Sequence, residues 1–177
     1  IVHIVDFFIF LDLIFILYLG NKSFLLKIIP LSISHNQPIR GSFLKFLVEL
    51  GEKVISFLPG YPMLDRDLVL CGTLLYKIGK VEAFNNDIYP NLTELGSLIG
   101  YSILGRDILR QANKSIKNFP KNILMKLEYI ILSQREGENQ YCKKIDKFPE
   151  AVFVNYIYKM DEEIDFMFES NNRNIKK

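Results

Sequence analysis

The stretch Leu74-Leu75-Tyr76-Lys77-Ile78-Gly79-Lys80 closes the segment of this sequence that decides the fold. Upstream of it, Asp65 is a favourable N-cap residue for a helix. The apolar residues that follow recur at helical spacing and form one inner face: Leu68, Cys71, Leu75 and Ile78. Gly79 stands where a helix C-terminus favours a left-handed residue. The pattern therefore predicts a central helix from Asp65 to Ile78, with Leu74 and the inner face largely buried.

Helical periodicity continues on both sides of this segment, and no run of alternating strands with hairpin turns is found. Four further long helices are predicted: Phe43 to Leu58, Leu95 to Leu109, Lys121 to Ser133, and one from Pro149 through Met167. Two polar segments separate them as loops: Glu82–Asn91 and Gln134–Phe148. The fold class predicted is all-α, a helical bundle in one domain.

Composition favours a packed globule, because 49% of the residues are hydrophobic and 13% are aromatic. The formal charge of +2 is too balanced to indicate nucleic-acid binding by charge alone. The two cysteines, Cys71 and Cys142, form neither a disulfide framework nor a zinc site. We expect a reducing, cytoplasmic location, with Cys71 as a small core residue.

The first stretch, Ile1 to Gly20, is very apolar, but Asp6 and Asp12 interrupt it and a basic leader is missing. Its uncharged runs are too short to span a bilayer, so a buried helix is favoured over a membrane anchor. Large apolar residues recur in it at helical spacing: Phe7, Phe8, Leu11, Ile14, Phe15 and Tyr18. We expect this helix to dock on the domain, on a partner protein or on a second copy.

The sequence divides into three parts: an apolar helix at 1–22, a helical domain at 23–170 and a disordered tail at 171–177. The first part is interpreted as a link to a further module or a remnant of one.

From about Phe24 to Phe168 the chain resembles the HD domain of the YhaM-type 3′–5′ exoribonucleases, which belong to the HD superfamily of metal-dependent phosphohydrolases. The opening stretch is similar to their Leu-Leu-His-Asp-Ile-Gly-Lys motif. Other parts of the scaffold match in order and spacing: Pro30, Tyr61-Pro62, Arg66-Asp67-Leu68, Gly72, Gly96 with Gly100, Ile131-Leu132-Ser133, Glu150-Ala151 and Tyr156-Ile157. The resemblance implies an HD-domain-like helical bundle.

At the functional positions the resemblance breaks, because the family's His-Asp pair falls on Tyr76-Lys77. Phenol is a poor metal ligand at neutral pH, and an ammonium group repels a cation. Other positions that match family motif residues carry Lys45, Tyr101, Gln134, Arg135 and Tyr158. Among the family's motif residues only His35 and Asp161 remain, so neither a metal nor any other cofactor is expected.

The residue inventory points the same way without an alignment. The chain has two histidines, His3 and His35, and both precede every long helix. One acidic cluster lies on the last helix, and we interpret it as a solvated face in preference to a metal site: Asp161, Glu162, Glu163 and Asp165. Tyr76 and Tyr101 are expected to fill the emptied pocket, because a cavity would destabilise the core.

The favoured function is that of a catalytically inactive HD-domain homologue, a pseudoenzyme with a binding or scaffolding role. The alternatives are an active metal-dependent phosphohydrolase that uses Asp161 and His35, or a decaying gene product without a role. The cations at or beside the altered positions form a candidate anion site for RNA or a nucleotide: Lys45, Lys77, Lys80, Arg135 and Lys159. In the competing interpretation, these side chains extend into solvent and their stems cover apolar surface.

Overall fold

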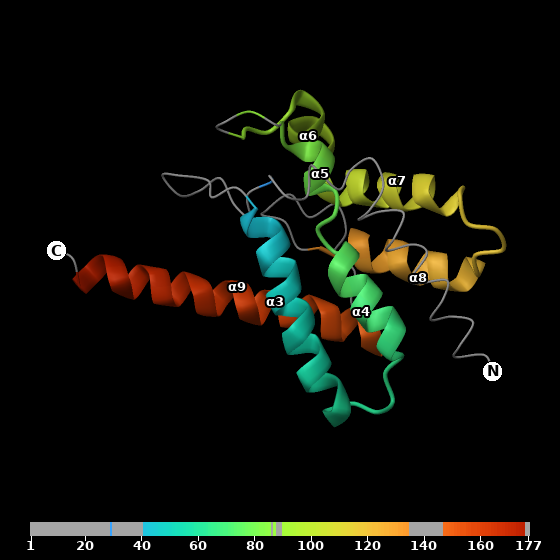
Figure 1. Ribbon diagram of the computed structural model, residues 1–177, viewed down its shortest axis with the longest axis horizontal. Helices are drawn as coiled ribbons and strands as arrows, with labels where there is room; N and C mark the ends of the chain where they lie inside the picture. The colour runs from blue at the N-terminus through green and yellow to red at the C-terminus, as the bar shows by residue number, and fades with distance from the viewer. Residues whose placement is uncertain (1–28, 30–40, 86, 88–89, 135–146, 176–177) are drawn as a thin grey trace.

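A computed structural model describes residues 29, 41–85, 87, 90–134 and 147–175 of the chain. These residues form a bundle of α-helices with one short 3₁₀-helix (Figure 1): α3 (Ser42–Phe57), η1 (Leu58–Gly60), α4 (Arg66–Leu75), α5 (Lys80–Ala83), α6 (Glu94–Ile99), α7 (Tyr101–Asn113), α8 (Lys121–Leu132) and α9 (Pro149–Ile175). Within the described ranges, the one extended pairing is an antiparallel bridge between Phe84 and Leu92. The all-α prediction is confirmed.

Helix α4 is the centre of the bundle, as predicted, and it packs against α3, α8 and α9. Asp65 begins it as the N-cap, and its carboxylate accepts a hydrogen bond from the Leu68 amide at 3.0 Å. The predicted inner face is buried, and Leu74 is partly buried against the same core. Burying an apolar face of this size is the main stabilising contribution to a helix this short.

The end of α4 differs from the prediction. The helix ends at Leu75, and Tyr76 to Gly79 continue as successive turns before the single-turn helix α5. Gly79 is not left-handed, since its φ is −61°. Its need for glycine is steric: an added Cβ would lie 1.8 Å from the Tyr101 carbonyl oxygen, on the neighbouring helix α7. Because α5 occupies Lys80–Ala83, the loop predicted from Glu82 also begins later.

The long helix predicted from Leu95 to Leu109 is wrong, because Gly100 breaks it into α6 and α7. Gly100 has φ 80°, a conformation that L side chains rarely adopt and that a helix cannot contain. Leu95 and Leu98 are consequently exposed on α6, outside the core that their spacing predicted. The apolar face of α7 is buried, with Leu104 and Leu109 in the core.

Helix α9 runs along the bundle and then beyond it (Figure 1). At its first turn the buried carboxylate of Glu150 accepts a hydrogen bond from the Asp65 amide at 3.1 Å, which joins the starts of α9 and α4. Its outer half projects past the other helices towards the C-terminus. The helix continues to Ile175, so it includes residues 171–175 of the segment predicted as a disordered tail, and residues 176–177 lie outside the described residues.

Several predictions fall outside the described residues, namely the N-terminal helix at 1–22, His35, Arg135 and Cys142. In the described part of the chain, none of the helices is long and apolar enough to cross a membrane.

Candidate functional site at the end of helix α4

Tyr76 and Lys77, which the resemblance places at the family's His-Asp pair, lie in the turns after α4, where α8 and α9 pack against α4. Around them the structure brings together a group that we call the Tyr76 cluster: Tyr76, Lys77, Ser133, Asn155, Tyr158 and Glu162. Ser133 ends α8, while the last three members lie on α9 at spacings of three and four residues. This spacing puts them on one side of α9, facing the end of α4.

Tyr76 is buried and its hydroxyl donates a hydrogen bond to the side-chain oxygen of Asn155. The Asn155 amide nitrogen in turn donates to the Ser133 hydroxyl at 3.1 Å. Ser133 completes the chain by donating to the Ile130 carbonyl oxygen at 2.8 Å. Buried polar groups need such partners, since an unpaired one costs about 1–3 kcal/mol. The phenol is thus both a filler of the core and one end of a satisfied polar network.

Tyr158, which the resemblance places at an Asp of the family's last motif, is 1% exposed. Its ring lies 4.3 Å from that of Tyr76 and 5.6 Å from that of Phe46, measured between centroids. Its hydroxyl donates to the Thr73 carbonyl oxygen of α4 at 2.8 Å. Aromatic pairs at such distances stabilise a core beyond the area they bury. Tyr76 and Tyr158 therefore form a tilted aromatic pair, with an angle of 35° between the ring planes.

Lys77 is buried along its stem, and its ammonium group forms an ion pair with Glu162 of α9. The same nitrogen lies 5.4 Å from the centroid of the Tyr158 ring, within the range of a cation–π contact. Glu162 therefore balances the charge of Lys77, the lysine that the resemblance places at the family's Asp.

The acidic cluster of α9 departs from the predicted solvated face at one residue, Asp161, which is buried and forms an ion pair with Lys53 of α3. Glu162, Glu163 and Asp165 are exposed, as predicted. Glu162 pairs with Lys77, and Glu163 lies 3.7 Å from Lys159. The cause is the register of α9, which turns Asp161 towards α3 while Glu163 stays outside.

The remaining predicted cations do not gather around the cluster in any contact of the described residues. Lys45 and Lys159 are exposed, and each lies near a glutamate four residues further along its own helix. Lys80 is buried, with its nitrogen 5.6 Å from the Tyr101 ring centroid. With Arg135 outside the described residues, the shared anion site stays a prediction.

Gln134, which the resemblance places at a family His, forms hydrogen bonds with the turn after α4. Its amide nitrogen donates to the carbonyl oxygens of Tyr76 and of Ile131, the latter at 2.7 Å. Its own side-chain oxygen is buried and has no hydrogen-bond partner among the described residues. Tyr101 is half-buried beside Lys80, so it fills space next to the cluster rather than within it.

The donor set around Tyr76 does not fit a divalent metal. In the described ranges no three His, Cys, Asp or Glu side chains come together as metal ligands. What the Tyr76 cluster offers instead is a phenol, an amide, a hydroxyl and one ammonium–carboxylate pair, groups suited to packing and hydrogen bonding.

The sequence did not point to Asn155 or to the pairing of Glu162 with Lys77. One signal existed: Asn155 is a polar residue within the apolar face of a helix, three residues before Tyr158. A buried amide in such a position needs a partner, and a buried tyrosine hydroxyl supplies one.

No protein-family model and no solved structure matches the chain. Curated proteins do match: the 3′–5′ exoribonuclease YhaM of Bacillus subtilis is 28% identical over 107 residues, which is 60% of this chain. That of Bacillus licheniformis is 31% identical over 108 residues, and that of Bacillus pumilus 29% over 122 residues.

The described residues form an all-helical domain, and the matched segments make up 60–68% of this chain. The chain is a distant homologue of the YhaM 3′–5′ exoribonucleases, which confirms the resemblance expected from its motifs. It spans only about a third of the length of the curated relatives it matches, 34–37%.

Proposed function

We propose that this chain is a catalytically inactive relative of the YhaM exoribonucleases, with a binding or scaffolding role. One observation carries the proposal: Tyr76 and Lys77 stand at the positions of the His-Asp pair and are engaged with Asn155 and Glu162. A metal at this point would need the Lys77 charge removed and the Tyr76–Tyr158 ring pair opened.

The physical argument is electrostatic. Bringing a divalent cation close to an ammonium group that is itself shielded from water is strongly unfavourable, because the local dielectric constant is low. A neutral phenol offers no compensation at physiological pH, since its ordinary pKa is about 10. The competing function, an active phosphohydrolase using Asp161 and His35, would require Asp161 to leave its pair with Lys53.

The test is metal content together with RNA degradation. We expect the chain, after incubation with Mn²⁺ and gel filtration, to retain no stoichiometric metal and to leave a short single-stranded RNA intact. The paired variant Tyr76→His/Lys77→Asp reintroduces the family's residues and is compared at equal protein concentration. Stoichiometric metal or manganese-dependent cleavage in the unaltered chain contradicts the proposal. Circular dichroism confirms that each sample is folded.

For the binding role we propose an anionic ligand, a nucleotide or an RNA backbone, recognised by Lys77 and Arg135. Lys77 is held by Glu162, so a phosphate must compete with that carboxylate for the ammonium group. The relatives are named as exoribonucleases, which supports this class of ligand. Binding of this kind weakens as salt rises, because counterions are released from the phosphates.

This competition gives a sharp experiment. Removing the Glu162 charge in Glu162→Gln should strengthen oligonucleotide binding at low salt, while Lys77→Ala and Arg135→Ala should weaken it. Glu163→Gln is the matched control: it removes the same charge from the next residue, where the partner is the exposed Lys159. Equal effects of the two glutamine variants would show that binding responds to the net charge of the chain and not to the Glu162–Lys77 pair. No binding at all would leave only the scaffold role.

A further inference from the structure

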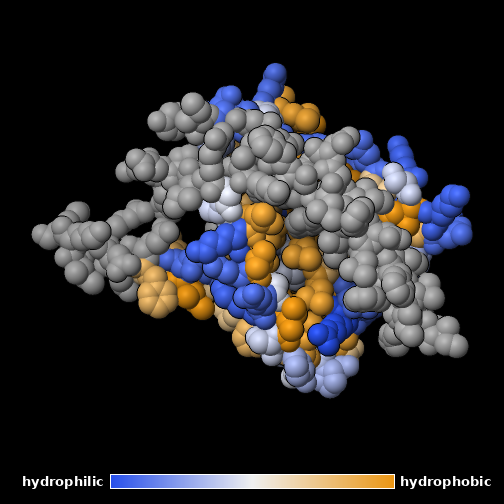
Figure 2. Space-filling view, viewed as in Figure 1, coloured by the Kyte–Doolittle hydropathy of each residue, from blue (hydrophilic) through white to orange (hydrophobic). Residues whose placement is uncertain are grey.

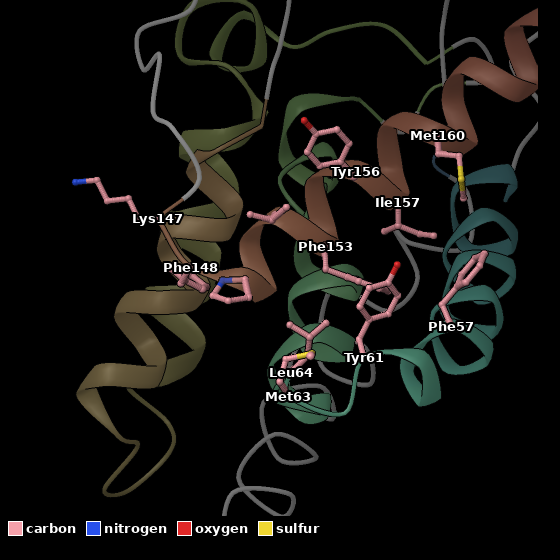
Figure 3. Close-up of a pocket in the computed structure, with 12 residues that line it drawn as sticks. Phe57, Tyr61, Met63, Leu64, Lys147, Phe148, Phe153, Tyr156, Ile157 and Met160 are labelled. Carbon is pink, nitrogen blue, oxygen red and sulfur yellow. The ribbon is translucent and has the colours of Figure 1, made fainter.

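A groove of about 680 Å³ lies between the connection from α3 to α4 and the first half of α9 (Figure 3). Tyr61 and Phe153 meet in it edge to face, with ring centroids 5.5 Å apart. A second groove of about 410 Å³ continues along the outer half of α9, and the two share Tyr156 and Met160. Together they form one apolar trough along α9.

The outer part of this trough is a single helix face, which we call the α9 stripe: Tyr156, Met160, Ile164, Met167 and Phe168. The spacing of three and four residues places these side chains along one side of the helix. All five are exposed, and Figure 2 shows apolar side chains gathered on the projecting part of α9. A contiguous apolar surface of this kind marks an interaction site.

We propose that the α9 stripe is covered by the α9 stripe of a second copy of this chain. The two α9 helices pack antiparallel about a two-fold axis that passes between Met160 and Ile164. The projecting half of each helix then enters the trough of the other copy. This inference is independent of the proposed function.

The available area matches what a stable dimer needs. Beyond the stripe, the trough exposes four further apolar side chains: Phe57, Tyr61, Met63 and Val152. Nine side chains of roughly 200 Å² each, about half exposed, give roughly 900 Å² per copy. A standard protein–protein interface buries about 800 Å² per partner.

The charges bordering the stripe are self-complementary. A two-fold axis brings the same surface of both copies together, so a border of one sign would repel itself. Here Lys159 and Glu163, of opposite sign, both line the outer groove. An antiparallel arrangement brings Lys159 of one copy near Glu163 of the other, close to the axis. Of the other acidic groups, Asp161 and Glu162 are paired with Lys53 and Lys77, and the exposed Asp165 lies on the opposite flank of the stripe from Lys159 and Glu163.

The length of α9 gives a further reason for pairing. A helix that projects without neighbours is marginal in water, because most helical stability in proteins comes from packing an apolar face. A second copy supplies such a face along the whole projecting half and removes its apolar side chains from solvent.

The test is the oligomeric state of the whole chain, measured by sedimentation across a range of concentrations. We expect a dimer whose dissociation constant rises at least about tenfold in Ile164→Lys, a change of about 1.4 kcal/mol. The matched control is Phe166→Lys, two residues away, 67% exposed and on another side of α9. It should dimerise as the unaltered chain does.

A monomer at every concentration overturns the proposal and assigns the stripe to another occupant, such as the apolar segment at 1–22. A dimer unchanged by Ile164→Lys, or weakened equally by both variants, overturns it as well, because the contact then lies elsewhere.

Discussion

Two regions of α9 behave in opposite ways. In its first half, Asn155, Tyr158 and Asp161 are buried, and each has a partner on α3, α4 or α8. In its outer half, apolar side chains of similar size are largely exposed. The same helix thus places polar groups inside the bundle and apolar groups outside it. Burial here follows from which neighbour lies opposite a residue, and residue type alone does not decide it.

The largest effect that would test this contrast is expected at Gly79, beside the buried half. Gly79→Ala places a Cβ 1.8 Å from the Tyr101 carbonyl oxygen, so the α5–α7 contact must open. We expect a loss of about 4 kcal/mol or more in the free energy of unfolding, measured by urea denaturation. The control is Gly60→Ala, where an added Cβ meets nothing within 4 Å, and it should change little. Equal stability of the two variants would contradict the close approach.

Leu75→Ala comes next, because Leu75 is fully buried at the end of α4. Removing this side chain should cost about 2–5 kcal/mol, the usual range for a buried leucine. Ile164→Ala, on the exposed stripe, should cost about 0.5 kcal/mol or less in the monomer. Urea denaturation at low protein concentration compares the two. If the alanine at 164 costs as much as the one at 75, the outer half of α9 is buried and the contrast fails.

A smaller effect is expected for one hydroxyl group. Tyr76→Phe removes the donor to Asn155 while keeping the ring that packs on Tyr158. The expected loss is about 1–2 kcal/mol, because the buried Asn155 oxygen loses its nearest donor. The control is Tyr156→Phe, which removes a hydroxyl from an exposed tyrosine of α9. Its melting temperature in thermal unfolding should equal that of the unaltered chain. No difference between the two variants would argue against a buried network.

The sequence predicted much of the buried region and little of the site. Helical spacing found α4 and its inner face because an apolar stripe has one simple cause, the bundle core. It failed at Gly79 and Gly100, since nothing local tells a glycine needed for close packing from one needed for positive φ. It also missed the register of α9 that buries Asp161. That register depends on Lys53, which lies 108 residues away along the chain.

The smallest expected effect concerns the chemical reactivity of Cys71, which lies in the buried region. Burial raises the pKa of the Cys71 thiol, and the nearby Asp67 raises it further. At a given pH, a smaller fraction of Cys71 than of an ordinary cysteine is therefore present as the reactive thiolate. Raising the pH to about 9 should not bring its labelling rate up to that of an ordinary cysteine. In a Cys142→Ser variant, maleimide labelling of the native protein should be very slow and become fast in urea. Rapid native labelling would show that the core opens readily.

The contacts that close this core also constrain the order in which a newly made chain can fold. Tyr76 meets Asn155 79 residues later, Asp65 meets Glu150 after 85 residues and Lys53 meets Asp161 after 108. Because α9 covers one side of α4, the apolar face of α4 stays open to water until the ribosome has synthesised Tyr158. During that interval the chain needs protection from aggregation, and any early stop before α9 would leave a product with its centre uncovered.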